Sequence, residues 1–331
     1  CHLYCLRHAI EFQKTNRNVI IESNHIYNNS MYGIFLNETN LHQLNISTNH
    51  ISYCKSTIYV KNGDVHNVQI TGNDIELGYI YINENDEFIT DIDYAIHFEN
   101  YTHTVESVLI TGNTIEDHQR GKGLIYLDSN SYANFFKIAI VGNQFANSPG
   151  HEIHLRSVQD CAITGNAFKK SQLQSIKIER SNANTNITGN TFGSYGVLLV
   201  ESSLTGFKFS NNVCNNIRLN PITINTLSLT NHIVSTQIND NIFHMNANGN
   251  QLSGYLIDIQ TLDMDNSTLK NNIIRCRSYC NNGIRVGGFR PTSSIDKLSI
   301  TDNMLTHFPS EKIKYSLPES ETDNIIIRDN I

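Results

Sequence analysis

The sequence contains no tryptophan, only 5 prolines among 331 residues, and no run of basic residues. Charged residues make up 17% of the chain, and low charge with few prolines argues against disorder. The 31 acidic residues outnumber the 24 lysines and arginines, which gives a formal net charge of -7 at pH 7. We therefore expect no nucleic-acid partner. No apolar stretch approaches the roughly 20 residues of a membrane span, so we expect no membrane insertion.

The hydrophobic content of 39% is enough to bury a sizeable core, in one elongated domain or in two compact ones. Seven cysteines are scattered along the chain without the spacing of a metal site. We predict no metal site and no cofactor. The first residue is Cys1, and Ile331 ends the sequence inside a repeated phrase, so we expect a fragment of a longer chain.

A short phrase returns along the whole chain without being copied letter for letter. Residues 108–117 read VLITGNTIED, residues 68–77 read VQITGNDIEL, and residues 161–170 read CAITGNAFKK. The residue three places before the asparagine is always large and apolar, and the residue two places after it is apolar as well. The intervals between the aligned asparagines run from 22 to 40 residues, which is typical of a solenoid with loops inserted between rungs. The aligned asparagines are Asn24, Asn49, Asn73, Asn113, Asn143, Asn166, Asn190, Asn212, Asn241, Asn272, Asn303 and Asn330.

The residue before each of these asparagines is Gly, Ser, Thr, Asn or Asp, which suits a bend with positive φ. We expect the asparagines to form an internal ladder by hydrogen-bonding the rungs above and below. A second strand follows each bend, for example AIHF at residues 95–98 and LIYL at residues 124–127, with the period-two pattern of a half-buried strand. Helical periodicity is absent. The sequence predicts an all-β, single-stranded parallel β-helix of about 11–12 coils over residues 1–331, with residues 76–93 as an inserted acidic loop.

The asparagine ladder, the aliphatic and phenylalanine stacks and the β-branched rungs resemble the right-handed parallel β-helix of the pectate-lyase-like superfamily. The resemblance covers essentially the whole chain. The Asn- and Ile-rich phrases are most similar to the shaft of a phage tailspike that cuts bacterial surface polysaccharide. This resemblance implies a homotrimer, a polysaccharide substrate, and a location outside the cell or on the virion surface. The superfamily also includes lyases, hydrolases, epimerases and adhesins, so the fold alone does not select the activity.

The candidate site follows from reading one face of the second strand down the stack. We expect the third residue of each strand, and the residue two places later, to be exposed and to point the same way. In the middle of the chain these positions hold aromatic, imidazole, basic and acidic side chains, which suit a sugar polymer. The predicted substrate-binding residues are Tyr59, His97, Tyr126, His154, Arg156 and Lys177, and the predicted catalytic carboxylates are Asp128, Glu179, Glu99 and Glu201.

Rung spacing connects these carboxylates with hydrolysis. Asp128 and Glu179 are expected two rungs apart, at about 9.6 Å, near the upper end of the range for an inverting glycosidase. We favour this pair. Glu99 with Asp128, or Glu179 with Glu201, would lie on neighbouring rungs at roughly 5 Å, the separation of a retaining enzyme.

Three alternatives stay open. A lyase would use Lys177 as base beside Arg156, with His154 or Tyr126 as acid, to eliminate across a uronate. A non-catalytic adhesin or shaft would use the same face to bind a glycan. The alternating charges could also serve only to keep like charges apart in the stack. The inserted loop could carry Asp91 and Asp93 into the groove, or remain a solvated acidic loop.

Overall fold

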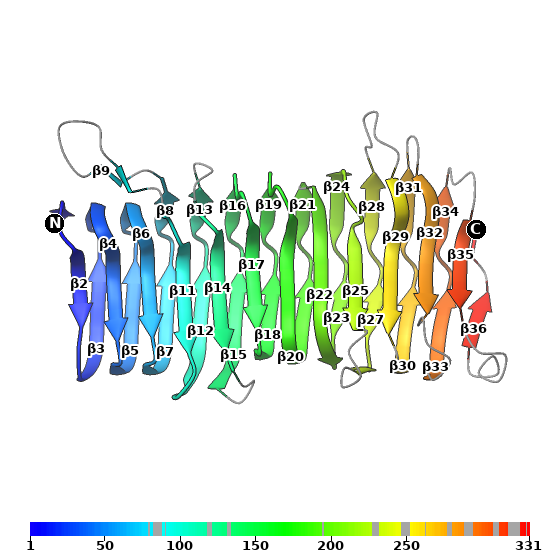
Figure 1. Ribbon diagram of the computed structural model, residues 1–331, viewed down its shortest axis with the longest axis horizontal. Coiled ribbons are helices and arrows are strands. Elements are labelled where there is room, and N and C mark those ends of the chain that lie inside the picture. Colours follow the sequence, from blue (N-terminus) through cyan, green and yellow to red (C-terminus); the bar gives the residue numbers. More distant parts are fainter. Residues whose placement is uncertain are drawn as a thin grey trace. The chain divides into compact units, whose positions relative to one another are not determined.

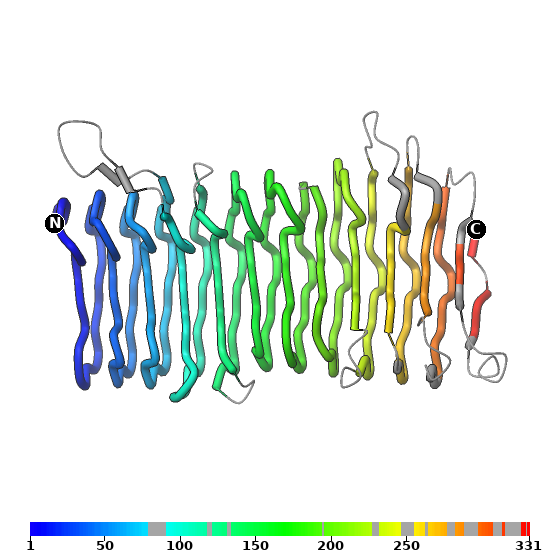
Figure 2. The backbone as a smooth tube through the Cα atoms, viewed as in Figure 1, coloured from blue at the N-terminus to red at the C-terminus, as the bar shows by residue number. Residues whose placement is uncertain are grey.

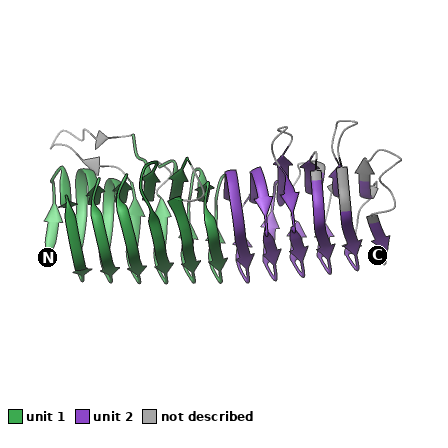
Figure 3. Cartoon of the chain, turned by 90° about the horizontal axis from the view of Figure 1, so that it is seen from below, with its two compact units in different colours: residues 1–173 green, residues 174–331 purple. Residues whose placement is uncertain are grey.

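The structure is a computed structural model of an all-β protein. It describes residues 1–78, 80–81, 88–89, 91–117, 121–130, 134–193, 195–226, 232–245, 252–261, 263–276, 280–287, 294–306, 311–316, 325–328 and 330–331. The chain divides into two compact units, unit 1 at Cys1–Leu173 and unit 2 at Gln174–Ile331 (Figure 3). The fold is the predicted right-handed parallel β-helix, with about 10 turns against the 11–12 expected.

In unit 1 the strands form three stacks, which we call stacks A, B and C, and each turn of the chain visits C, then A, then B (Figures 1 and 2). Stack A contains β3 (Thr15–Glu22), β5 (Asn40–Ser47), β7 (Asp64–Thr71), β12 (Val105–Thr111), β15 (Phe135–Val141) and β18 (Gln159–Thr164). Stack B contains β1 (His2–Tyr4), the first parts of β4 (His25–Asn37) and β6 (His50–Lys61), then β8 (Asp74–Leu77), β13 (Thr114–Asp117), β16 (Gln144–Ala146) and β19 (Ala167–Lys169). Stack C contains β2 (His8–Phe12), the second parts of β4 and β6, then β11 (Tyr94–Asn100), β14 (Gly123–Ser129) and β17 (His151–Arg156).

Unit 2 is built in the same way from three stacks of its own, which we name by the same letters. Its stack A holds the end of β20 (Gln174–Thr188), β23 (Lys208–Ser210), β27 (Gln237–Asn239), the end of β30 (Asp263–Lys270), β33 (Ser294–Thr301) and β36 (Ile325–Arg328). The short β26 (Ile233–Val234) pairs with the end of β22 (Gly196–Thr205) and the start of β30. Stack B holds β21 (Thr191–Gly193), β24 (Val213–Ile217), β28 (Ile242–Met245), β31 (Ile273–Cys276) and β34 (Met304–Thr306). Stack C holds the start of β20, then β22 (Gly196–Thr205), β25 (Ile222–Thr226), β29 (Leu252–Thr261), β32 (Cys280–Gly287) and β35 (Glu311–Ser316).

The core is a set of side-chain columns that run from rung to rung. The apolar residue three places before each ladder asparagine is buried throughout unit 1, as Ile46, Ile70 and Ile110 illustrate. The residue two places after it is buried too, for example Phe145, whose ring stacks on Phe168 with centroids 4.9 Å apart. Both columns confirm the sequence pattern, because residues at the same place in the repeat meet in register.

The bend before each ladder asparagine has the predicted positive φ. It is +64° at Gly112 and +63° at Gly142, and non-glycine residues take the same conformation at other bends, as at Ser23 and Thr48 with φ of 55° and 53°. Apart from Gly112 itself and its two chain neighbours, no atom of the described residues lies within 4 Å of the position that a Cβ would occupy there. Glycine is therefore favoured there by backbone conformation and not by close packing.

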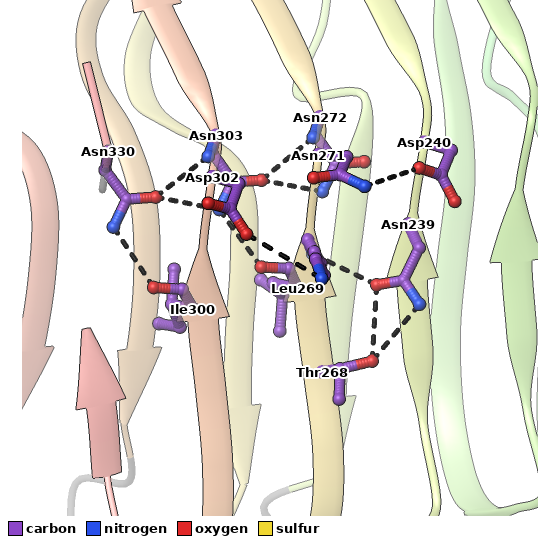
Figure 4. A network of polar contacts seen from close by, with 11 residues as sticks. Asn239, Asp240, Thr268, Leu269, Asn271, Asn272, Ile300, Asp302, Asn303 and Asn330 are labelled. Carbon is purple, nitrogen blue, oxygen red and sulfur yellow. Dashed lines mark hydrogen bonds and ion pairs between the residues drawn. The ribbon is translucent and has the colours of Figure 1, made fainter. Parts of the chain in front are cut away.

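The asparagine ladder is confirmed within each unit. From Asn24 to Asn166, the side-chain oxygen of each ladder asparagine accepts from the backbone N–H and the side-chain amide of the preceding one, at 2.9–3.1 Å. The same pattern runs from Asn190 to Asn330 at 2.9–3.2 Å. Figure 4 shows its last steps, where Asn303 also donates to the Leu269 carbonyl at 3.0 Å. The hydrogen bonds offset the cost of burying these amides.

The predicted acidic insertion is described only in part. Glu76 and Leu77 continue β8, so the insertion starts later than the sequence suggested. Within it, β9 (Ile80–Tyr81) pairs antiparallel with β10 (Phe88–Ile89), while residues 79, 82–87 and 90 lie outside the described residues. Asp91 accepts from Lys55 at 2.7 Å. In the described residues, no helix has the length and apolar character needed to cross a membrane.

Candidate active site

The predicted face lies on stack C, and in unit 1 its residues are in register as expected. Tyr59, His97, Tyr126 and His154 occupy the same place on β6, β11, β14 and β17. Two residues further along the same four strands come Lys61, Glu99, Asp128 and Arg156. The strand alternation therefore brings residues almost 100 positions apart in the chain onto one side of one sheet.

Three of the four rings in the column are buried and Tyr126 is half-buried, which corrects the expectation that the column is exposed. Tyr59, His97 and His154 are 7%, 5% and 9% exposed. Ring centroids are 4.6 Å apart for Tyr59 and His97, 5.1 Å for His97 and Tyr126, and 4.8 Å for Tyr126 and His154. The rings of Tyr94 and Tyr126 are stacked, with centroids 4.4 Å apart. Rungs spaced about 4.8 Å apart let each ring cover the next, so an outward position on a strand need not be accessible.

Asp128 is the centre of a hydrogen-bonded cluster beside this column. It is 2% exposed, and its Oδ2 accepts from the hydroxyls of Tyr101 at 2.6 Å and Tyr126 at 2.9 Å. Nη1 of Arg156 donates to the same oxygen at 2.8 Å and to the Tyr126 hydroxyl at 2.6 Å. A buried carboxylate needs partners of this kind, and a guanidinium supplies the strongest of them. Burial, together with the charge of Asp128, raises the pKa of Tyr101, so this tyrosine remains a proton donor at neutral pH.

Glu99 is the more accessible carboxylate, with its side chain 26% exposed. It accepts from the Tyr59 hydroxyl at 2.9 Å, and its Oε2 lies 3.8 Å from Nε2 of His97. On the other side of the imidazole, Oδ2 of Asp93 lies 3.5 Å from Nδ1. His97 is thus a buried ring between two carboxylates. Of the two alternatives left open for the inserted segment, Asp93 fits the one in which it reaches the predicted face, whereas Asp91 pairs with Lys55.

A hollow opens at the start of the same face in unit 1. It has a volume of about 570 Å³ and is lined by Leu6, Arg7, His8, Glu11, Gln13, Phe35 and Asn37. Three of these residues, Glu11, Phe35 and Asn37, occupy outward positions of β2 and β4 on stack C, and Gln13 directly follows the end of β2. The hollow therefore continues the column of the candidate site and contains a cation, a carboxylate and an aromatic ring.

In unit 2 the predicted residues form an ion-paired group. Glu179 and Glu201 are in register on β20 and β22, as expected for neighbouring rungs. Lys177 contacts the carboxylates of both, at 3.1 Å in the case of Glu201. Burial lowers the pKa of Lys177, but hydrogen bonds and charge from the two glutamates outweigh it and raise the pKa on balance. Lys177 is therefore a cation that separates two like charges.

The favoured carboxylate pair spans the two units. Asp128 belongs to unit 1 and Glu179 to unit 2, so their separation stays a prediction. Within unit 1, sequence reasoning missed Tyr101 and Tyr94 as members of the site. Tyr101, one residue past the end of β11, continues the alternation of His97 and Glu99, a signal that was present in the sequence. Tyr94 lies at the first position of β11, and its contact with Tyr126 depends on how the inserted segment enters the strand.

No model of a protein family matches this sequence, and neither the curated proteins nor the solved structures contain a protein that matches it.

Proposed function

We propose that this protein degrades polysaccharide by hydrolysing glycosidic bonds of a bacterial surface glycan, and that the outward face of stack C in unit 1 binds the chain. The observation that carries the proposal is the register of Glu99 and Asp128 on neighbouring rungs beside a column of aromatic rings. Rungs about 4.8 Å apart give a carboxylate separation near that of retaining glycosidases. The superfamily that the repeat resembles contains glycoside hydrolases. If the protein is a tailspike of that superfamily, it is a homotrimer located outside the cell or on the virion surface.

The two carboxylates would have different roles because their surroundings differ. Glu99 is accessible and faces the Tyr59 hydroxyl and the His97 ring, so it would act directly on the glycosidic bond. Asp128 would reach the substrate only after Tyr101 or Arg156 moves aside, since both donate to its Oδ2. A sugar hydroxyl could replace the Tyr101 hydroxyl as the hydrogen-bond donor to Asp128 Oδ2, and Asp128 would then contact the substrate. Two carboxylates held in unlike environments are the general pattern of an acid and its partner base or nucleophile.

The hollow at the start of stack C supports glycan binding beside the carboxylates. Arg7 and Glu11 offer directional hydrogen bonds to hydroxyls, and Phe35, which is 7% exposed, lines the hollow among stacked rings. In stacking order, Phe35 lies beside Tyr59, with centroids 5.5 Å apart, and Tyr59 beside His97. A polymer lying along the stack would thus contact the hollow and Glu99 together.

Elimination by a lyase is the second candidate, and the ion pairs of Lys177 weigh against it. A lysine base must be neutral to accept a proton, whereas the two glutamates beside Lys177 raise its pKa. Arg156, the expected partner for the uronate carboxylate, already binds Asp128 and Tyr126.

The experiment incubates the purified chain with a panel of bacterial surface polysaccharides and measures new reducing ends. We expect wild type to release them, and Glu99→Gln to lower the rate by at least about 100-fold, in the range that general acid–base groups contribute. Glu22→Gln, at an exposed position of β3, is the matched control and should cut at the wild-type rate. Ultraviolet absorbance of an unsaturated product would identify elimination. Binding without new reducing ends would identify an adhesin, and unchanged cleavage by Glu99→Gln would refute the assignment of Glu99.

A further inference from the structure

A separate group of side chains lies on the outer side of stack A in unit 1. His42 on β5 is in register with His66 on β7, and their rings stack with centroids 4.8 Å apart. Asp64 lies two residues before His66 on β7, so the strand alternation turns both side chains to the same side. One ligand atom from each of His42, Asp64 and His66 lies within 4.8 Å of the other two. These residues are distinct from those of stack C discussed above.

The separation of two of these ligand atoms fits a single divalent ion. Nε2 of His66 lies 3.1 Å from Oδ1 of Asp64, which is also hydrogen-bond distance. Two ligand atoms that are each about 2.1 Å from a zinc ion lie about 3.4 Å apart at the tetrahedral angle and about 3.0 Å apart at a right angle. The observed separation falls between these values. Two imidazoles with one carboxylate are a donor set that suits zinc and its neighbours in the first transition row, and not calcium or magnesium.

Glu106 on β12 supplies the outer carboxylate that metal-binding histidines usually have. Its Oε2 lies 3.5 Å from Nδ1 of His66, on the side of the ring opposite Asp64, and the two residues are in register. A carboxylate at Nδ1 favours the tautomer that leaves Nε2 free to bind a metal. Nζ of Lys137 contacts the other oxygen of Glu106 at 2.5 Å and holds that carboxylate in place. Asp64, His66, Glu106 and Lys137 therefore form one continuous chain of contacts.

We propose that His42, Asp64 and His66 form a binding site for a zinc-type divalent cation, with Glu106 orienting His66. The three protein ligands leave at least one coordination position for water or for a donor from another molecule. The side chains of Asp64 and His66 are 38% and 21% exposed, so an ion reaches them from solvent. Because the ligands come from two consecutive turns, the ion joins β5 to β7 by side-chain bonds in addition to the backbone ladder.

A second cluster provides the sharpest internal comparison. His50, Asp74 and Glu76 on stack B also bring one ligand atom each within 4.8 Å of the others. There, however, Nδ1 of His50 faces Asp74 at 3.0 Å and Nε2 contacts the Ser52 hydroxyl at 3.1 Å, so a hydroxyl occupies the place that Glu106 holds beside His66. This cluster contains one imidazole, where the proposed site contains two. We therefore expect the stack A cluster to bind zinc more tightly.

The test measures Zn²⁺ binding to the full chain, produced without a histidine tag and stripped with a chelator, by isothermal titration calorimetry. We expect one tight site that Ca²⁺ and Mg²⁺ do not occupy. His66→Gln and His42→Gln should weaken it by at least about 100-fold, and Glu106→Gln by about 10-fold, the scale of changes around a metal ligand. Asp64→Asn provides a surface variant that tests the same site if a histidine variant fails to fold, with circular dichroism as the check.

His244→Gln, at an exposed position of β28 in unit 2, is the matched control and should bind zinc as wild type does. Retention of wild-type affinity by His66→Gln or by Asp64→Asn would overturn the proposal. A loss of the tight site in His50→Gln would also overturn it, since the ion would then occupy stack B. Failure of wild type to bind Zn²⁺ at all would overturn it as well. None of these measurements depends on polysaccharide cleavage.

Discussion

Arg156 and Asp128 form an ion pair between consecutive turns of unit 1, at 2.8 Å, with the aspartate side chain 3% exposed. The pair lies beside the aromatic column and holds the hydroxyl of Tyr126 between its two members. An ion pair with a buried member is costly to break, because the remaining charge keeps its desolvation penalty and loses its partner. The same contacts that order the candidate site therefore contribute to the stability of the fold.

Arg156→Leu should lower the free energy of unfolding by about 3 kcal/mol, because it leaves the Asp128 carboxylate buried without its cation. Adding Asp128→Asn to this variant should recover part of the loss by removing the buried charge. Asp91→Asn is the control, because it breaks the ion pair between Asp91 and Lys55, in which the Asp91 side chain is 70% exposed. It should lower the free energy of unfolding by at most about 1 kcal/mol. Urea denaturation followed by circular dichroism measures all three. A double variant less stable than Arg156→Leu would contradict the interpretation.

Asp93 should make unit 1 sensitive to acid. Burial raises the pKa of Asp93, but the contact with His97 and the charge of Lys122 outweigh it, so the pKa lies below the ordinary value of 3.8. A depressed carboxyl pKa stabilises the folded state above the unfolded pKa, and this contribution is lost as the pH falls through the folded pKa. Asp93→Asn should therefore destabilise the protein clearly at pH 7 and less at about pH 3, which lies below the ordinary aspartate pKa of about 3.9. Unfolding curves of both proteins at the two pH values measure the difference. An equal loss at both would rule out this role.

The sequence contained enough to predict the fold because the determinants of a solenoid recur in every turn. Each determinant has a local physical cause that is visible in a single sequence. Examples are the period-two alternation at Ile96 and Phe98, the left-handed backbone at Gly112 and the ladder hydrogen bond of Asn113. Register then follows, since a one-residue slip would turn the apolar columns outward.

The candidate site was predictable only in part. Alternation placed His97, Glu99 and Asp128 on the same side of one stack, and the structure confirms their register. It did not predict that His97 and Asp128 are buried, because their cover comes from neighbouring turns and from Tyr101, beyond the end of the strand. The histidines of the proposed zinc site were overlooked for a related reason. His42 and His66 are 24 residues apart, and no short spacing motif marks ligands that come together only through stacking.

The five free cysteines in the described residues should react in two groups. Cys1 and Cys5 are exposed, whereas Cys54, Cys161 and Cys214 are buried. Burial raises the pKa of Cys54 to about 11 and that of Cys161 to about 12, so these thiols are both inaccessible and protonated at neutral pH. Iodoacetamide at pH 8 should label Cys1 and Cys5 in the native protein and the other three only after denaturation. Mass spectrometry of the peptides identifies each site. Native labelling of Cys161 would contradict the buried column.

Substitution of a ladder asparagine such as Asn113 should lower the free energy of unfolding more than substitution of other polar residues in unit 1. Asn113 is 1% exposed, and its side-chain oxygen accepts from Asn73 while its amide donates to Asn143 and to the Ile70 carbonyl. Asn113→Ala removes both functions at once and strands buried donors and acceptors in the turns on either side. With a cost of about 1–3 kcal/mol for each buried group left without a partner, we expect a loss of at least about 3 kcal/mol.

Asn40→Ala is the matched control, since Asn40 is exposed at the start of β5 and its side chain is no part of the ladder. It should change the free energy of unfolding by less than about 0.5 kcal/mol. Asn113→Asp tests the donor alone, because the carboxylate keeps the acceptor and loses the amide that binds Asn143. It should be destabilised as well, and more strongly at neutral than at acid pH, where protonation restores one donor. If Asn113→Ala were as stable as Asn40→Ala, the ladder would accompany the fold without stabilising it, and the apolar columns alone would hold the turns together.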